Sequence, residues 1–191
     1  PFLWSFDHAI AHSLANPVHE VERNLELLKP LGTLVKLKPE LQVSKATFAS
    51  IEKYRAIPYI TVAPASVWKT KQFPVHKWIA FIEAIESQLT IYIIGGPDDI
   101  KLGNEIQQQT HSGVVNLCGT LNLLQSAALM EGALMNYMND SAPMHLASAM
   151  NAPTTAIFCS TIPAFGFGPL ADDRTVIESD QKLTCRPCGI H

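Results

Sequence analysis

The sequence predicts an α/β fold in which helices flank a parallel sheet. From residue 58 onward, short apolar runs alternate with stretches whose apolar side chains recur at the helical period. Polar loops rich in small residues follow most of these runs, as they do at the ligand-binding edge of a parallel sheet. With 191 residues, of which 47% are hydrophobic, the chain is long enough to bury a sizeable core. Together these observations predict a Rossmann-like sheet connected by crossover helices.

The first part of the chain has a less regular pattern. Residues 1–16 are predicted to be irregular, whereas the spacing of apolar positions predicts a helix over residues 18–28. Residues 33–57 are predicted to form a connector and then a helix at 45–55. We therefore expect two parts: residues 1–57, the remnant of an N-terminal domain with its linker, and residues 58–191, the α/β domain.

Strands and helices alternate regularly within residues 58–191. Each strand is a mainly apolar run of four to six residues, and each helix is bounded by proline, glycine or a capping residue. The predicted strands are 59–62, 90–94, 114–117, 133–138, 154–158 and 175–178, and the predicted helices are 75–88, 98–110, 121–131 and 143–150.

Right-handed crossovers place the loops that follow the strands along one edge of such a sheet. Ligands bind at this edge, outside the carboxyl ends of the strands. The loops concerned are residues 63–74, 95–99, 139–142 and 159–168.

The strand-to-helix junction at residues 139–146 has the features of an anion site. Asp140 or Ser141 can cap the helix, and Pro143 suits its first turn. The free N–H groups at Ser141 and Ala142 then lie at the positive end of the helix dipole, where a diphosphate binds well. The alternative is a capped helix that binds nothing, with His145, one turn further on, as a structural residue.

Two other loops carry candidate ligands for a nucleotide. The loop at 63–74 combines small residues with the hydroxyl of Ser66 and the ammonium of Lys71, which together suit phosphate oxygens; the alternative is a solvated loop. Asp98 is a candidate acceptor for ribose hydroxyls or, alternatively, a helix N-cap. Neither GxGxxG nor GxxxxGK[ST] occurs in the sequence, which argues against a nicotinamide oxidoreductase and a P-loop enzyme.

Charge and hydropathy argue against nucleic acid as a partner and against a membrane-spanning segment. The chain has 14 basic and 17 acidic residues, a net charge of −3 and no long basic run, which argues against nucleic acid as a partner. No apolar run approaches the roughly 18 residues needed to span a bilayer, and no leader opens the chain. We therefore expect a cytoplasmic protein without a transmembrane segment.

The four cysteines fall into two groups. Cys118 and Cys159 lie in apolar, strand-like surroundings and are expected to be reduced thiols. Cys185 and Cys188 form a CxxC pair that fits half of a zinc site, a redox pair or a disulfide, and the sequence leaves these alternatives open. Because the chain begins with proline and stops inside this segment, we expect it to be a fragment.

Three stretches resemble the ADP-heptose:lipopolysaccharide heptosyltransferase family, glycosyltransferase family 9. They are the basic-x-aromatic-Pro turn at residues 71–74, the junction at 139–146 with the small-residue helix that follows, and the stretch at 165–169 before the terminal cysteines. Residues 19–32 are also similar to the family's linking helix. The resemblance covers most of the chain.

This resemblance implies that the chain is the C-terminal, donor-binding half of a GT-B glycosyltransferase. The enzyme would transfer heptose from ADP-heptose, with inversion, to the lipopolysaccharide inner core at the inner face of the inner membrane, without metal or cofactor. Lys71, the N–H groups at Ser141 and Ala142, and His145 would stabilise the leaving diphosphate. Ser66 would lie near the phosphates, Asp98 would contact the ribose, and Asp140 would brace the loop or contact the sugar.

Two departures from the family pattern affect this expectation. Many members have glycine where this chain has Ala142, and the general base is expected in an N-terminal domain that these residues lack. The chain alone is therefore expected to bind nucleotide without turnover. Alternatives from other classes are a non-catalytic nucleotide-sugar-binding or interaction module of GT-B type, and an epimerase that shares the GT-B fold.

Overall fold

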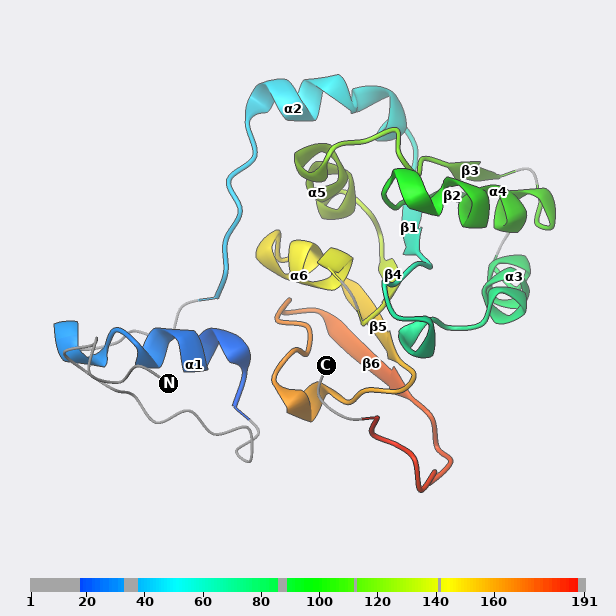
Figure 1. The fold of residues 1–191 in the computed structure, drawn as a ribbon. Coiled ribbons are helices and arrows are strands. Elements are labelled where there is room, and N and C mark those ends of the chain that lie inside the picture. Colours follow the sequence, from blue (N-terminus) through cyan, green and yellow to red (C-terminus); the bar gives the residue numbers. More distant parts are fainter. Residues whose placement is uncertain (1–17, 33–37, 86–88, 112, 141, 189–191) are drawn as a thin grey trace.

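The computed structural model describes residues 18–32, 38–85, 89–111, 113–140 and 142–188. Within them, six parallel strands form one sheet in the order β3-β2-β1-β4-β5-β6 (Figure 1). The predicted α/β fold with a parallel sheet is confirmed. The strands are β1 Tyr59–Ala63, β2 Thr90–Ile93, β3 Val114–Asn116, β4 Asn136–Asn139, β5 Thr154–Phe158 and β6 Arg174–Glu178.

The helices form layers on the two faces of the sheet (Figure 1). Helices α2, α5 and α6 cover one face, and helices α3 and α4 cover the other. Helix α1 lies apart from both layers, close to the loop after β5. The α-helices are α1 Glu20–Glu26, α2 Lys45–Ser50, α3 Val75–Glu83, α4 Ile100–Gln108, α5 Leu123–Glu131 and α6 Ala142–Ala149; 3-10 turns are η2 Lys29–Leu31, η3 Glu52–Tyr54, η4 Lys69–Lys71, η5 Pro97–Asp99 and η6 Pro163–Phe165.

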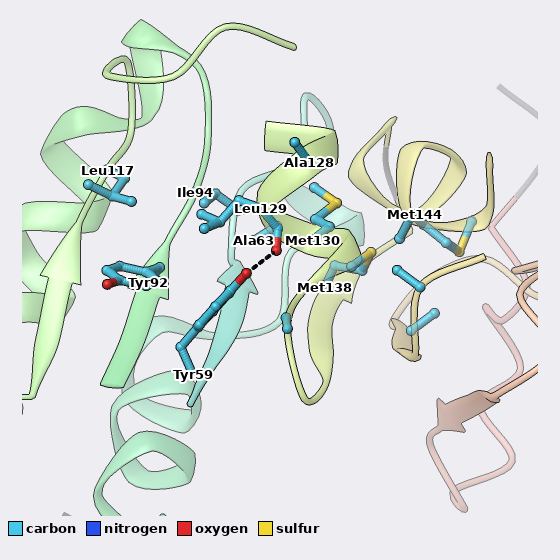
Figure 2. Close-up of a cluster of buried hydrophobic side chains, with 14 of the residues drawn as sticks. Tyr59, Ala63, Tyr92, Ile94, Leu117, Ala128, Leu129, Met130, Met138 and Met144 are labelled. Atoms are coloured by element: carbon cyan, nitrogen blue, oxygen red, sulfur yellow. Dashed lines mark hydrogen bonds between the residues drawn. The ribbon is translucent and has the colours of Figure 1, made fainter. Parts of the chain in front are cut away.

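A hydrophobic core lies on each face of the sheet. On one face Trp78 and Ile82 of α3 and Ile106 of α4 are fully buried against β1 and β2. The other core, drawn in Figure 2, packs α5 and α6 on the sheet. There the hydroxyl of Tyr59 donates to the carbonyl of Leu129 at 2.7 Å, and burial raises the pKa of this tyrosine to about 12. This buried polar contact ties β1 to α5.

The strand order places a topological switch point between β1 and β4. The chain runs from β1 outward through β2 to β3, and then returns to pair β4 on the other side of β1. The buried Asn136 fixes this junction: its side-chain oxygen accepts from Thr61 at 2.5 Å, and its amide donates to the carbonyls of Met130 and Pro153. The carboxyl ends of β1 and β4 therefore sit side by side, where this class of sheet binds ligands.

Some predicted boundaries are wrong. The fourth strand was predicted at 133–138, but β4 starts at Asn136 because the chain first turns after α5, leaving Leu134 60% exposed. The helix predicted at 98–110 begins as the turn η5, and the helix predicted at 45–55 is divided into α2 and η3. The predictions for residues 1–16 and for part of the 33–57 connector lie outside the described residues, as does the predicted end of the 75–88 helix.

Candidate functional site

A cavity of about 870 Å³ opens at the carboxyl edge of the sheet, beside the switch point. Its volume lies in the range of about 300–1,000 Å³ typical of small-molecule sites. The loops after β1 and β2 form one side, and the starts of α5 and α6 form the other. Its walls are mainly apolar, with contributions from Ile94, Leu121, Leu123, Met130 and Leu146. Such walls suit a flat heterocyclic ring.

Asn139, the last residue of β4, fixes the shape of the loop after β1. Its fully buried side chain donates to the carbonyl of Pro64 at 2.5 Å and accepts from the N–H of Phe73 at 3.0 Å. Both ends of the 64–73 loop are thereby bonded to one side chain. The loop also has an internal contact, in which Gln72 Nε2 donates to the carbonyl of Ser66 at 2.7 Å.

Lys71 and Asp140 form an ion pair next to this loop. Lys71 Nζ lies 2.9 Å from Asp140 Oδ2, and the two side chains are 20% and 8% exposed. The hydroxyl of Thr161, in the loop after β5, donates to the same carboxylate oxygen at 2.5 Å. Charge-assisted contacts of this kind are stronger than neutral ones. Lys71 therefore has a defined position, and the Asp140 carboxylate points into the protein.

Ser66 and Asp98 both line the cavity. The Ser66 hydroxyl is half-buried and donates to the main-chain carbonyl of Asp140 at 3.4 Å. Asp98 is exposed and has no hydrogen-bond partner among the described side chains, so it is accessible to a ligand. The bracing function belongs to its neighbour Asp99, whose Oδ2 accepts from the N–H of Gly96 at 2.8 Å.

Of the residues predicted at the start of α6, Ala142 lines the cavity and is exposed as the first residue of the helix. Ser141 lies outside the described residues. His145, one turn further, does not line the cavity; its ring packs edge-on to Phe167, with 6.4 Å between the centroids. The structure thus groups Ser66, Lys71 and Asp140 by direct contact.

The environment of His145 nevertheless includes the charged pair. Although His145 is partly exposed to solvent, desolvation by the surrounding protein lowers the pKa of His145 below 6.5, and the nearby His19 lowers this pKa further. The Asp140 carboxylate has the opposite effect on the pKa, and Lys71 again lowers it. The pKa of His145 therefore depends on the charges of Lys71 and Asp140.

Sequence reasoning missed Thr161, did not single out the buried Asn139, and did not foresee the apolar wall of α5. Asn139 carried a signal, because a polar side chain ends a buried strand. Thr161 lies in a loop expected at the same edge, but its contact with Asp140 depends on the pairing of β4 with β5. Leu123 is 68% exposed at a cavity wall, which a hydropathy pattern alone does not reveal.

The cysteines are free thiols in the structure. Cys118 is buried and Cys159 is half-buried, and burial raises the pKa of each. Cys185 and Cys188 lie in the segment after β6, which is bonded to the loop after β5: the N–H of Cys188 donates to the carbonyl of Ser160 at 2.8 Å. Across the described ranges, no three His, Cys, Asp or Glu side chains cluster as a metal ion requires.

Helix α1 docks on the stretch at 165–168. The ring of His19 accepts from the N–H of Val21, so its other nitrogen donates to the carbonyl of Gly168 at 3.0 Å. The buried Arg23 pairs with Glu20 at 2.7 Å and also reaches the carbonyl of Phe165. These contacts attach α1 to the loop that follows β5.

Comparison with known proteins places these features in a family. A family model described as glycosyltransferase family 9 (heptosyltransferase) matches residues 3–189. The lipooligosaccharide heptosyltransferase 2 of Haemophilus influenzae is 31% identical over 155 residues, covering 74% of this chain and 44% of that protein. The lipopolysaccharide heptosyltransferase 3 of Escherichia coli is 29% identical over 168 residues, covering 82% of this chain and 48% of that protein.

A solved structure, that of the E. coli ADP-heptose lps heptosyltransferase II, superposes on the chain with a TM-score of 0.68 and 25% identity. The superposition covers 76% of this chain and 46% of that one. The chain thus spans about half the length of the relatives it matches. Among the described helices, none is both long and apolar enough to cross a membrane. Since the family model matches nearly all of the sequence, the chain belongs to glycosyltransferase family 9, the heptosyltransferases.

Proposed function

We propose that this chain forms the ADP-sugar-binding lobe of an inverting heptosyltransferase that transfers heptose from ADP-heptose to the inner core of lipopolysaccharide. The observation that carries the proposal is the cavity at the switch point, whose lining residue Ser66 bonds to the main chain of Asp140, the ion-pair partner of Lys71. An apolar chamber next to a positioned cation suits a nucleoside diphosphate. The name of the E. coli structural relative, which includes ADP-heptose, supports the choice of nucleotide.

In this proposal the base and ribose occupy the cavity. The base lies between the apolar walls that include Leu121 and Leu123, and the ribose hydroxyls donate to Asp98, whose carboxylate is exposed and unpaired among the described residues. The diphosphate extends past Ser66 toward Lys71. The N–H groups at Ser141 and Ala142 and the ring of His145 complete its surroundings. Donors fixed in advance at a leaving diphosphate lower the barrier to transfer, because they need not reorganise as charge develops.

We further propose a division of the chain at residue 57. Residues 1–57 belong to the linker and the N-terminal lobe, with helix α2 of the linker packed on the sheet, and residues 58–191 form the donor lobe. The acceptor and the general base would then meet the donor from the N-terminal lobe, so the chain alone is expected to bind nucleotide without transferring sugar. The acceptor is lipopolysaccharide core at the cytoplasmic face of the inner membrane, where the protein would act peripherally.

Calorimetric titration of the chain with ADP, UDP and NAD tests the nucleotide assignment. ADP is expected to bind most tightly, and Lys71→Ala is expected to weaken it by about tenfold to a hundredfold, as for the loss of a hydrogen bond to a charged group. Lys69→Ala is the matched control, since Lys69 belongs to the same turn but is exposed. Equal binding of ADP and UDP, unaffected by Lys71→Ala, would contradict the proposal.

A further inference from the structure

Arg186, between the two terminal cysteines, is bonded to the loop that follows β5. Its Nε donates to the carbonyl of Cys159 at 2.8 Å, and its Nη2 lies 3.2 Å from the carbonyl of Phe158 and 3.0 Å from that of Thr161. Nη2 also pairs with Glu178 of β6 at 2.6 Å. The Arg186 side chain is only 13% exposed. One planar guanidinium thus bonds the carbonyl at the end of β5 and two carbonyls of the loop that follows it, which its rigid fork of donors suits.

The loop held by Arg186 is also the loop that contacts the ion pair at the cavity. Thr161, whose carbonyl accepts from Arg186, donates its buried hydroxyl to Asp140 Oδ2 at 2.5 Å. The same Asp140 oxygen lies 2.9 Å from Lys71 Nζ. The contacts therefore run without a gap from Arg186 through Thr161 and Asp140 to Lys71. Each member before Lys71 is largely buried, so a displaced group has little solvent to compensate it.

We propose that Arg186 is a positioning residue for the donor diphosphate, acting through Thr161 and Asp140 to hold the Lys71 ammonium at the phosphate site. The inference rests on the proposed function of the cavity. It gives the cysteine-flanked segment a function in donor binding that requires neither a metal nor a disulfide. Arg186 itself touches neither the cavity nor Lys71, so it acts by fixing the Asp140 carboxylate.

The test compares ADP with adenosine, because adenosine fills the cavity but lacks the diphosphate. Arg186→Gln and Thr161→Val are each expected to weaken ADP binding by about fivefold to tenfold and to leave adenosine binding unchanged. Arg186→Lys keeps the charge but loses the fork, and is expected to behave like Arg186→Gln. Thr161→Ser keeps the hydroxyl and is expected to bind ADP as tightly as the unsubstituted chain does. Lys182→Gln, which removes an exposed positive charge from the same segment, is the matched control.

A double-mutant cycle shows whether the effect passes through Lys71. In a Lys71→Ala background, Arg186→Gln is expected to have little further effect on ADP affinity. Additive losses, or equal losses for ADP and adenosine, would overturn the proposal, because they would indicate a general loosening of the fold.

A measurement without nucleotide separates this inference from the proposed function. The rate at which acetic anhydride acylates Lys71 is followed by mass spectrometry. The Lys71 side chain is only 20% exposed while it is paired with Asp140, and its release makes the amine more accessible to the reagent. Arg186→Gln and Thr161→Val are therefore expected to raise this rate, and Lys182→Gln is not. An unchanged rate overturns the positioning route even if ADP binds. A raised rate in a chain that binds no ADP supports the route and contradicts the proposed function alone.

Discussion

The ammonium of Lys71 lies 2.9 Å from the carboxylate of Asp140, so this lysine beside the cavity is paired before any ligand arrives. A diphosphate at this position must share Lys71 with Asp140. The carboxylate therefore has two opposing effects on an anionic ligand: it fixes the lysine, and it repels the phosphates. A substitution that keeps the geometry but removes the charge separates the two.

Asp140→Asn is expected to tighten ADP binding by about twofold to tenfold, because the amide oxygen still accepts from Thr161 and Lys71 while the repulsion disappears. Asp140→Ala removes the negative charge and also the oxygen that accepts from Thr161 and Lys71, so it is expected to weaken ADP binding. Calorimetry at two salt concentrations measures the ADP affinity of each variant, and the gain in affinity of Asp140→Asn should shrink at higher salt. Asp180→Asn, at an exposed position beyond β6, is the control. If Asp140→Asn weakens ADP as much as Asp140→Ala does, the repulsion argument fails.

The pKa of His145 is expected to lie below 6.5 in the free protein and to rise when ADP binds. Burial and the neighbouring His19 lower the pKa of His145 in the unliganded fold. An incoming diphosphate favours the protonated ring and so raises this pKa. NMR titration of the histidine ring signals measures both values, with His145→Gln identifying the resonance. A pKa that ADP leaves unchanged would place the phosphates away from this ring.

The lowered pKa of His145 also makes the stability of the fold depend on pH. Because the folded-state pKa of His145 is lower than the unfolded value, the unfolded chain binds a proton more readily. The contribution of His145 to stability is therefore present above about pH 6.5 and is lost as the pH falls toward the folded-state pKa. His145→Gln should lose less stability than the unsubstituted chain over that window, as measured by urea unfolding.

Much of the fold could be predicted because its signals are local. The strand at Thr154–Phe158 was predicted to the residue, since its two threonines are β-branched and its other residues are apolar, as suits a strand that is buried on both faces. The strand before it was placed too early, because Ala133 and Leu134 are as apolar as a strand but lie in the turn after α5. Whether an apolar residue lies in a strand or in an exposed turn depends on tertiary contacts that composition does not encode.

The candidate site was predictable only in part, for the same reason. Lys71 and Asp140 were each singled out from their own loops, but their ion pair depends on β1 lying next to β4. Thr161 reaches Asp140 only because β5 pairs with β4. Arg186 had no signal at all beyond the cysteines beside it, since its partners are main-chain carbonyls, which any sequence provides.

Gly166→Ala is expected to loosen the attachment of α1 to the sheet domain. Gly166 has a φ of +101°, and an added Cβ would lie 2.7 Å from the carbonyl of Val18 and 3.0 Å from Arg23 Nη1. The left-handed backbone costs about 1 kcal/mol or more for alanine, and the clash adds to this cost. The carbonyl of Gly166 also accepts from the N–H of Glu20, so a shift of this turn disturbs a contact with α1. Faster proteolysis within residues 18–32 and a lower unfolding midpoint should follow.

Gly96→Ala provides the matched comparison for this substitution. Its φ is −76°, and an added Cβ would meet only Asp99 Oδ2, at 3.7 Å, so alanine fits without strain. Alanine there also reduces the conformational freedom of the unfolded chain, so Gly96→Ala should keep or slightly raise the unfolding midpoint. If both variants resist proteolysis equally, α1 is not held through the Gly166 turn, and the contacts of His19 with Gly168 must suffice to dock it.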